Sequence, residues 1–489
     1  MKNALALILL ILGFFISPAQ NYHAVQGSSF AGSLGIDNNP ASIVNTPSPW
    51  DITVLSFQLK YATSAVKVLN YSLLGSPADS KYRFSKGDFS RFGTMNLNLH
   101  ILNARVALKR KQAIAFGMNL KSYSQINASQ FNISDTVRGI NDFLVDNQKN
   151  PYLHARLRSS SWLELFATYS KTLLETNTGR LNGGITVRAN RGVAGGFMNF
   201  QNVSFKKDLT PTGRPDFKIQ SAALGYGYSS NFDKWTKSRS TRDNLRDMVI
   251  SSEGGASVDL GVEYLVRGQV SSSFYDDDNY YDYDWKIGVS LLDIGKTNFK
   301  PGRESRIIND PTIGVSAIAF EKKFKKIYNF QSFNDSIATA VDGISSLSGV
   351  FGITNPARLV INADHWMGGD FYVNGELSVN LSAVPGIDAL HVSEMNFLTF
   401  TPRWETRKYG LYLPMQYNTG GQFWVGGAFK FGPIVGGLHN LGNVFSRNKM
   451  QNGGGYFALV IRPSSLTKKF RDARTDCPRI SVSGRRRNG

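Results

Sequence analysis

Residues 94–101 read Thr-Met-Asn-Leu-Asn-Leu-His-Ile, and this stretch decides the fold. Met95, Leu97 and Leu99 share one face of an extended chain, and the polar residues between them share the other. A strict period of two indicates a β-strand with one apolar and one polar face. With its neighbours the stretch runs for roughly 9–13 residues, the length that a tilted strand needs to cross a membrane.

The same alternation returns along the chain, at residues 55–61, 114–120, 258–264, 285–291 and 373–379. Charged residues such as Glu263 and Lys286 stand on the polar face of these stretches. Soluble β-sandwiches also alternate, but their strands average about five or six residues and do not repeatedly carry charges through the centre of one face. The sequence therefore predicts an all-β transmembrane antiparallel β-barrel of 14, and up to 16, strands with a polar lumen.

The composition excludes other classes of protein. Of 489 residues, 12% are aromatic, which is too much apolar surface for a disordered chain. A polytopic helical membrane protein is excluded because only one continuous apolar run exists. The single cysteine, Cys477, excludes an internal disulfide framework and a cysteine-based zinc site.

The one apolar run lies at the start of the chain. A basic Lys2, apolar residues 4–16 and the small-residue site Ser17-Pro18-Ala19 predict a secretory signal peptide at residues 1–19. In a Gram-negative cell, a Sec-exported barrel is expected in the outer membrane. All seven tryptophans except Trp235 lie near predicted strand ends, as in an interfacial girdle. These are Trp50, Trp162, Trp285, Trp366, Trp404 and Trp424.

The lengths of the connections test this topology. If the N-terminus is periplasmic, short turns at 109–112, 175–179, 367–370 and 405–409 lie on the inner side. Long connections at 63–90, 125–160, 193–217, 267–281 and 322–356 then lie on the outer side. Two connections, 230–253 and 294–311, are long yet assigned to the inner side. This assignment gives 16 strands, and 14 is equally defensible.

The chain divides into a hatch at residues 20–49, a barrel at 50–463 and a basic periplasmic tail at 464–489. The hatch is rich in Gly, Ser, Ala and Asn and has too few apolar side chains to be stable alone. Irregular backbone at membrane depth must be enclosed by protein, so we expect the hatch to plug the polar lumen. Pro40 is expected to fix a bend before the first strand. The tail is expected to be disordered or to dock an acidic partner.

Asn39, Pro40 and Ala41 form a motif that follows the small-residue segment 27–35 and precedes Trp50. In these features the chain resembles the long-chain fatty-acid transporter (FadL-like) superfamily of outer-membrane barrels. It looks most like an uncharacterised branch from gliding, type IX-secreting Gram-negative bacteria. The resemblance implies 14 strands and a plug segment that carries the motif.

Catalytic and cofactor motifs are missing from the sequence. It contains no His-Glu-x-x-His, Gly-x-Ser-x-Gly or phosphate loop, and its six histidines are scattered. We therefore expect no enzyme activity, no cofactor and no metal. The acidic, tyrosine-rich stretch 275–284 lacks the spacing of a calcium hand and is interpreted as a solvated outer loop. His100 is expected to be a polar residue facing the lumen.

Two short stretches resemble the Asp-Ser/Thr-apolar O-glycosylation sequon of the same bacteria. They make Thr136 and Ser336 candidate acceptors. Helix capping explains the preceding residues, Asp135 and Asp335, equally well.

The leading functional hypothesis is a porin-like channel for passive transport of small molecules, hydrophobic ones included. The alternative is a non-transporting barrel that serves as a subunit of a secretion or envelope-assembly complex. Outer-membrane lipids are expected partners, and an envelope protein complex is a candidate partner through the outer loops or the tail. Nucleic acid is excluded as a partner of an exported barrel, despite the formal charge of +19.

Overall fold

The computed structural model describes most of the chain between residues 25 and 463. The described ranges are 25–70, 80–109, 111–150, 152–236, 238–267, 282–311, 315–324, 327–339, 341–382, 390–445 and 449–463. The predicted signal peptide, the start of the hatch, the tail and Cys477 lie outside these ranges. Within them, no helix is long and apolar enough to cross a membrane.

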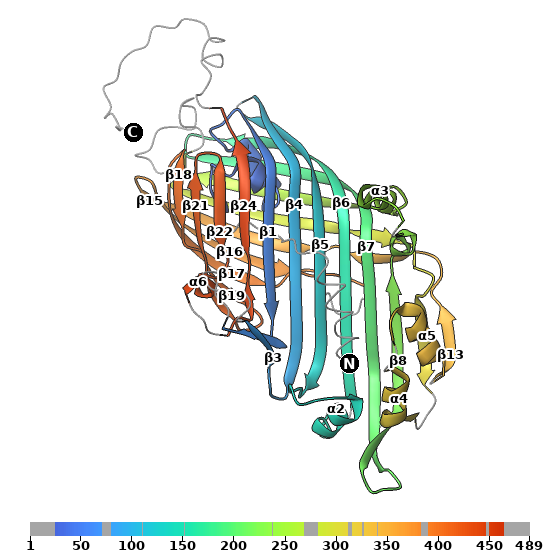
Figure 1. Cartoon of the computed structure of the whole chain (residues 1–489). Coiled ribbons are helices and arrows are strands. Elements are labelled where there is room, and N and C mark those ends of the chain that lie inside the picture. The colour runs from blue at the N-terminus through green and yellow to red at the C-terminus, as the bar shows by residue number, and fades with distance from the viewer. Residues whose placement is uncertain are drawn as a thin grey trace, which may run out of the picture.

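The described residues form a closed antiparallel barrel of 14 strands, as predicted (Figure 1). The first five strand paths are β1 (Trp50–Thr63), β4 (Phe89–Lys109), β5 (Gln112–Phe131), β6 (Tyr152–Glu175) and β7 (Gly179–Leu209). The last six are β16 (Phe371–Asn380), β17 (Phe397–Glu405), β18 (Tyr409–Tyr412) with β19 (Met415–Asn418), β20 (Phe423–Val425) with β21 (Gly427–Phe431), β22 (Ile434–Leu438), and β23 (Asn452–Gly453) with β24 (Gly455–Ile461). The barrel closes where β1 pairs with β24.

Three strand paths between β7 and β16 are interrupted by inserts. They are β8 (Pro215–Tyr228) with β9 (Gly254–Val266); β10 (Trp285–Phe299) with β11 (Arg306–Pro311) and β12 (Val315–Ser316); and β13 (Val341–Ser346) with β14 (Phe351–Thr354) and β15 (Arg358–Gly368). Both β8 and β9 pair with β7, at successive levels. Residues 230–253 are therefore an insert within one strand path and not an inner connection. Residues 294–311 likewise contain the end of β10 and all of β11, so the expectation of two long inner connections is wrong and the count falls from 16 to 14.

One predicted outer loop belongs to the other end of the barrel. Val266 pairs with Gly179, beside the inner turn between β6 and β7, and Trp285 pairs with Val266. The two strands that this connection joins therefore end and begin at the inner end of the barrel. The expectation that the connection starts and ends on the outer side is wrong, because it was based on the length of the connection and not on its place in the order of the strands. Most of the stretch lies outside the described ranges.

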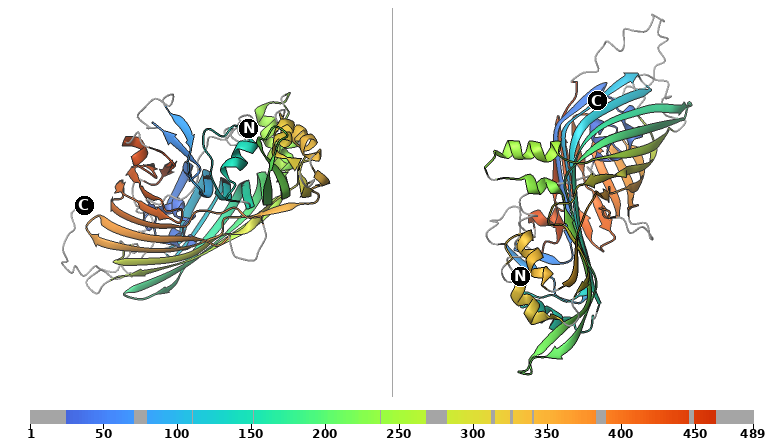
Figure 2. Two further views of the ribbon diagram at one scale, coloured as in Figure 1. Left: turned by 90° about the horizontal axis from the view of Figure 1, so that it is seen from below. Right: turned by 90° about the vertical axis from the view of Figure 1, so that its right-hand side faces the viewer.

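The remaining elements lie mostly on the outer connections. They are the hairpin of β2 (Val66–Leu69) with β3 (Lys81–Phe84), and the helices α2 (Ile140–Asp146), η5 (Ser230–Lys234), α3 (Thr241–Ile250), α4 (Ala317–Phe324), α5 (Phe330–Ala338) and α6 (Gly442–Phe445). Gly139 precedes α2, and Asn329 caps α5. Neither Asp135 nor Asp335 is an N-cap, so the capping interpretation is wrong. Figure 2 (right) shows the insert with α3 on the outside of the wall formed by β7.

The two faces of the strands differ as the alternation predicts. Glu263 and Lys286 are buried, whereas Val262 and Ile287 remain exposed. In β4 a register shift between His100 and Leu102 reverses the alternation. The outward face therefore passes from the odd to the even positions, and Leu102 is 51% exposed.

Tryptophans mark only part of the predicted girdle. Trp50, Trp285, Trp366 and Trp404 lie at the inner ends of β1, β10, β15 and β17. Trp162 and Trp424 are instead fully buried. Trp162 stacks on Tyr123 in the lumen, and Trp424 packs on Phe397. Including these two residues in the girdle was therefore wrong.

Large apolar side chains stay exposed over the outer surface of the barrel. Leu165 is 59% exposed, Phe116 is 53% exposed, and the exposed aliphatic and aromatic residues extend to β16 and β21. A closed barrel satisfies its backbone hydrogen bonds internally, and such a surface requires lipid rather than water. The fold is that of an outer-membrane β-barrel.

Candidate functional site

The lumen holds the chain that precedes β1. This N-terminal segment, residues 25–49, forms two short 3-10 turns, η2 (Gly32–Gly35) and η3 (Pro40–Val44), before the chain enters the wall at Trp50. Leu34, Ile36 and Ile43 are at most 1% exposed. Leu34 packs among residues of β18, β21, β22 and β24, and Ile36 and Ile43 pack against β5 and β6. The segment therefore contacts the wall on both sides of β1 and β4.

Asn39, Pro40 and Ala41 begin the turn η3. The side chain of Asn39 accepts a hydrogen bond from the Ala41 N–H at 2.9 Å, and Pro40 occupies the first turn. The Asn39 amide also donates to the Val262 carbonyl of β9 at 2.9 Å. The Ala41 carbonyl accepts from the Ser170 hydroxyl of β6 at 3.1 Å. The motif thus shapes the turn and binds it to the wall.

Glycines in three neighbouring strands make room for this motif. A Cβ atom at Gly261 of β9 would lie 2.1 Å from Asn39 Oδ1 and 2.9 Å from Pro40 Cδ. At Gly184 of β7 it would lie 2.5 Å from the Ala41 nitrogen, and at Gly288 of β10 it would lie 2.9 Å from Asn39 Nδ2. Gly184 pairs directly with Gly261 across the sheet. We call Gly184, Gly261 and Gly288 the glycine floor.

Asp37 connects the N-terminal segment to the charged side chains of the lumen. His100 Nε2 lies 2.7 Å from Asp37 Oδ2, and Arg188 Nη2 donates to Oδ1 at 3.0 Å. Lys121 Nζ is 3.9 Å from Oδ1. Burial raises the pKa of a carboxyl group, but Lys121, His100 and Arg188 outweigh burial and hold the pKa of Asp37 well below its usual range. Asp37 is therefore an anion in the closed lumen.

Around Asp37 lies a buried network of paired charges. Arg188 also binds Glu164 and, at 2.5 Å, Asp259. Lys121 binds Asp293 at 2.9 Å and Glu164 at 3.3 Å. Each of these charged side chains is at most 2% exposed. Because an unpaired buried charge is very costly, every member depends on its partners.

Asp51 anchors the middle of the N-terminal segment. It accepts a hydrogen bond from the Ser33 N–H at 2.7 Å and binds Arg105 Nε at 2.5 Å. Arg105 donates further to the carbonyls of Ile43 and Ser48. The Ser33 and Thr53 hydroxyls are 2.8 Å apart. Asp51 therefore holds the segment before the motif, at Ser33, and Arg105 holds it after the motif, at Ile43 and Ser48.

A separate anchor holds the start of the segment. The Gly27 carbonyl accepts hydrogen bonds from the Tyr283 hydroxyl at 3.2 Å and from Arg403 at 3.5 Å. Arg403 binds Asp364 at 2.5 Å. The segment is thus tied to β15 and β17 as well as to β1, β4 and β7.

The lumen is also entered from the outer side. Residues 390–396 precede β17, and Glu394 among them binds Lys60 of β1 and, at 2.7 Å, Arg358 of β15. Arg358 also donates to the Asp37 carbonyl at 2.9 Å. Arg358 therefore joins the N-terminal segment to the outer segment 390–396.

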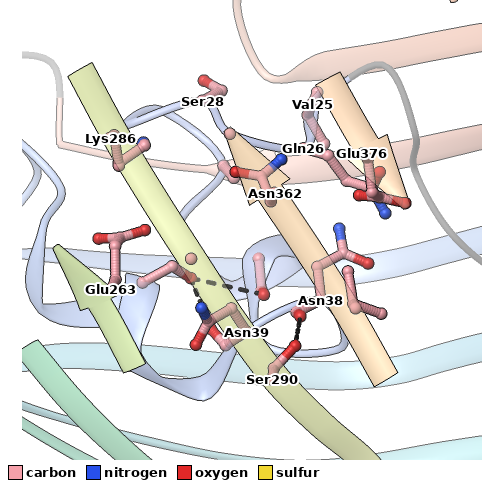
Figure 3. A pocket seen from close by; sticks show the side chains of 16 residues that line it. Val25, Gln26, Ser28, Asn38, Asn39, Glu263, Lys286, Ser290, Asn362 and Glu376 are labelled. Atoms are coloured by element: carbon pink, nitrogen blue, oxygen red, sulfur yellow. Dashed lines mark hydrogen bonds between the residues drawn. The ribbon is translucent and has the colours of Figure 1, made fainter. Parts of the chain in front are cut away.

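Cavities lie both inside and above this filled lumen. A cavity of about 30 Å³ lies between the N-terminal segment and strands β9, β10, β15 and β16, with Glu263, Lys286 and Glu376 in its lining (Figure 3). Beside it the Ser290 hydroxyl donates to the Asn38 carbonyl at 2.6 Å. A larger cavity of about 250 Å³, the outer vestibule, lies among residues 92–94 and 393–396, Asn127, Asn380 and Thr419. The small cavity has room for only one or two waters.

The predicted site residues fall in different places. Asn39, Pro40 and Ala41 lie in the lumen, and His100 faces the lumen as expected. Thr136 is exposed before α2, with its hydroxyl 2.6 Å from that of Ser134, and Ser336 lies in α5 and donates to the Ser332 carbonyl. Glycosylation of these residues stays a prediction. In the part of the chain that the structure describes, no cluster of three potential metal ligands occurs.

Sequence reasoning did not identify Lys121, Arg188, Arg358 and Asp293. The first three lie at positions of their strands that face the lumen. A charged residue at such a position in the alternation is the sequence signal that could have identified them. Asp293 has a left-handed backbone (φ +55°) at a register shift in β10, which no alternation predicts. It donates its N–H to Asp259 at 2.7 Å.

The fold and the filled lumen define an outer-membrane barrel whose interior is occupied by its own chain. The chain belongs to the family DUF5723, described as a family of unknown function, whose model matches residues 40–437. No curated protein matches the chain.

Solved structures match over most of the chain at low similarity. A mutant of the monoaromatic hydrocarbon channel TodX shares 9% identity over 88% of this chain and 93% of that chain, with a TM-score of 0.39. A FadL homologue of Pseudomonas aeruginosa shares 9% identity over 89% and 95%, with a TM-score of 0.39. The toluene transporter TbuX of Ralstonia pickettii shares 11% identity over 88% and 94%, with a TM-score of 0.37. The FadL homologue belongs to the superfamily that the motif around Asn39 resembles, and the type IX branch stays a prediction.

Proposed function

We propose that this chain is an outer-membrane channel for passive transport of small molecules, closed at rest by residues 25–49 acting as a hatch. The observation that carries the proposal is the attachment of Asp37. It joins the segment to β4, β5, β7 and β15 through side chains that all face the lumen. A segment held by ion pairs, hydrogen bonds and a few packed apolar side chains, rather than continued as a strand of the wall, can be released without breaking the barrel.

The polar character of these contacts supports a movable hatch. Hydrogen bonds and ion pairs in the lumen can be exchanged for contacts with water once a path opens, so their net contribution is modest compared with their number. The strand ladder that closes the barrel, between β1 and β24, does not involve the segment. Opening therefore leaves the wall intact.

A reversible lock tests the proposal. Ser33→Cys with Thr53→Cys, in a Cys477→Ser background, would join the segment to β1, because the two hydroxyls are 2.8 Å apart. We expect single-channel openings in planar bilayers to disappear on oxidation and to return with a reductant. Deletion of residues 25–36 should raise the conductance of a barrel that remains heat-modifiable.

The control lock joins two strands of the wall instead. Ser122→Cys with Ser161→Cys tethers β5 to β6, whose hydroxyls are 2.6 Å apart, and should leave the conductance unchanged. Equal conductance of the oxidised and reduced Ser33 lock, together with no gain on deletion, would refute a hatch. A non-transporting role would then be the better explanation.

A further inference from the structure

The outer vestibule is formed by parts of the chain that are far apart in sequence. Its lining comes from the outer ends of β4, β5 and β16, from residues 393–396 and from the connection between β19 and β20. Thr94 pairs with Gln125, and Gly93 with Thr63, at the outer end of β1. The cavity therefore lies at the mouth of the barrel, above Glu394.

Uncharged polar groups dominate this lining. It contains four side-chain amides and three hydroxyls, those of Gln125, Asn127, Asn380, Asn396, Thr94, Ser393 and Thr419. The Gln125 amide is committed to the wall of the cavity, since it binds the His391 carbonyl and Ser393. Among the described residues, the Asn127 amide, the Asn396 Nδ2 group and the Thr419 hydroxyl have no side-chain partner. These groups are available to a ligand.

The charge at the floor of the vestibule, the carboxylate of Glu394, is neutralised by its partners. Both carboxylate oxygens of Glu394 are bound, one by Lys60 and one by Arg358. A cationic ligand would have to compete with these two buried partners, and an anionic ligand would meet the carboxylate first. The chemistry of the floor therefore favours an uncharged ligand.

An apolar surface completes the cavity. Phe92 and Met395 line it and pack against the buried cluster that contains Trp424. An aromatic ring beside several amides suits a ligand that has both an apolar face and many hydroxyl groups. Amides both donate and accept hydrogen bonds, as hydroxyl groups require.

We propose that the outer vestibule binds a neutral saccharide of one or two sugar units. The inference deepens the proposed transport function and rests on it only for the step from binding to uptake. The cavity of about 250 Å³ suits a small ligand, and its amides and hydroxyls match the hydroxyls of a sugar. An aromatic hydrocarbon would leave the amides without partners, which opposes its binding.

Saturation-transfer NMR on the purified full chain tests the proposal. The protein is kept in an amine-oxide detergent, because glycosidic detergents would themselves occupy a saccharide site. Maltose and glucose are the probes, with toluene and lysine as the apolar and cationic comparisons. We expect transfer to the two sugars, with dissociation constants of the order of 1–10 mM, and none above background to toluene or lysine.

Two variants locate the site. Asn127→Ala with Asn396→Ala should weaken maltose binding roughly tenfold, because two uncharged hydrogen-bonding groups are lost. Gln130→Ala, on the same strand as Asn127 but outside the vestibule, should leave binding unchanged. Heat-modifiable mobility of each variant on gels verifies that the barrel has folded.

The outcomes are distinct. No transfer to either sugar, stronger transfer to toluene, or equal maltose binding by the double variant and the Gln130 variant would each overturn the saccharide site. Flux of sugars into liposomes is measured separately. Binding without flux would support the saccharide site and contradict the transport function. Flux without binding would support the transport function and contradict the saccharide site.

Discussion

The inner and outer halves of the lumen are both polar, but only the outer half keeps a cavity large enough for a small ligand. The inner half contains the N-terminal segment and a network in which Asp37, Arg188 and Lys121 are each paired. The outer half contains uncharged amides and a cavity of about 250 Å³. A buried charge requires fixed partners, whereas an amide is satisfied equally well by water. Charge therefore marks the half that the N-terminal segment closes at rest, and neutral polarity marks the half that stays accessible.

The largest expected effect comes from removing one charge from the inner half. Arg188→Met leaves Asp37, Glu164 and Asp259 with fewer partners, and should destabilise the barrel by about 3–5 kcal/mol or prevent assembly. Urea unfolding in lipid vesicles measures the change. Arg191→Met, three positions along β7, loses a hydrogen bond to the Ser252 carbonyl and should cost only about 1 kcal/mol. Equal losses would mean that the inner network has no special role.

The next effect concerns the glycine floor. Gly261→Val places side-chain atoms where Asn39 and Pro40 lie, and we expect it to displace the motif at a cost of about 1–3 kcal/mol. A cysteine at position 33, buried in the native protein, should then react faster with a maleimide. Gly254→Val, on the same strand with its nearest neighbour 3.9 Å from the new Cβ, is the control. Slow labelling in both variants would show that the floor does not position the segment.

Lowering the pH should release the N-terminal segment only at strongly acidic pH. The pKa of Asp37 is lowered in the folded protein, so its contribution is present above the unfolded pKa of about 4 and is lost only as the pH falls through the lower folded value. Bilayer conductance should therefore stay low from pH 7 down to about 4. Asp37→Asn weakens this attachment by about 1–3 kcal/mol and should raise conductance across the same range. Opening of the unaltered protein near pH 6 would conflict with this assignment.

The smallest effect is expected in the outer half. Asn127→Ala removes an exposed amide without a partner among the described residues, so the free energy of unfolding should change by no more than about 0.5 kcal/mol. The same urea titration used for Arg188→Met measures it. A loss comparable to that of Arg188→Met would erase the contrast between the halves.

The barrel could be predicted from the sequence because alternation reports directly on a wall with two different faces. The alternation of residues in the sequence predicts correctly that Glu263 and Lys286 face the lumen. Position along the barrel axis was harder to assign. The sequence predicts residues 230–253 to be a connection between two strands. A single strand path that is interrupted by an insert gives the same pattern in sequence as two separate strands.

The charged network was beyond sequence reasoning for a different reason. Alternation shows that Arg188 and Arg358 face inward, but not which carboxylates they meet, since partners depend on the stagger of all the strands. The sequence predicts the motif at Asn39 but not the glycine floor that it packs on. The glycines that make room for the motif, Gly184, Gly261 and Gly288, are present in the sequence. A single sequence does not show that three glycines on different strands lie side by side in the sheet.

The attachment points of the N-terminal segment also determine when it can reach its place. Asn39 binds Val262, 223 residues away, the Asp37 carbonyl meets Arg358 at a separation of 321, and Gly27 meets Arg403 at 376. Contacts at such separations form slowly, because long loops must close before the contacts can contribute. The first described residues of the chain are therefore among the last to settle. The N-terminal segment can therefore fill the lumen only after the strands that carry Val262, Arg358 and Arg403 have taken their places in the wall.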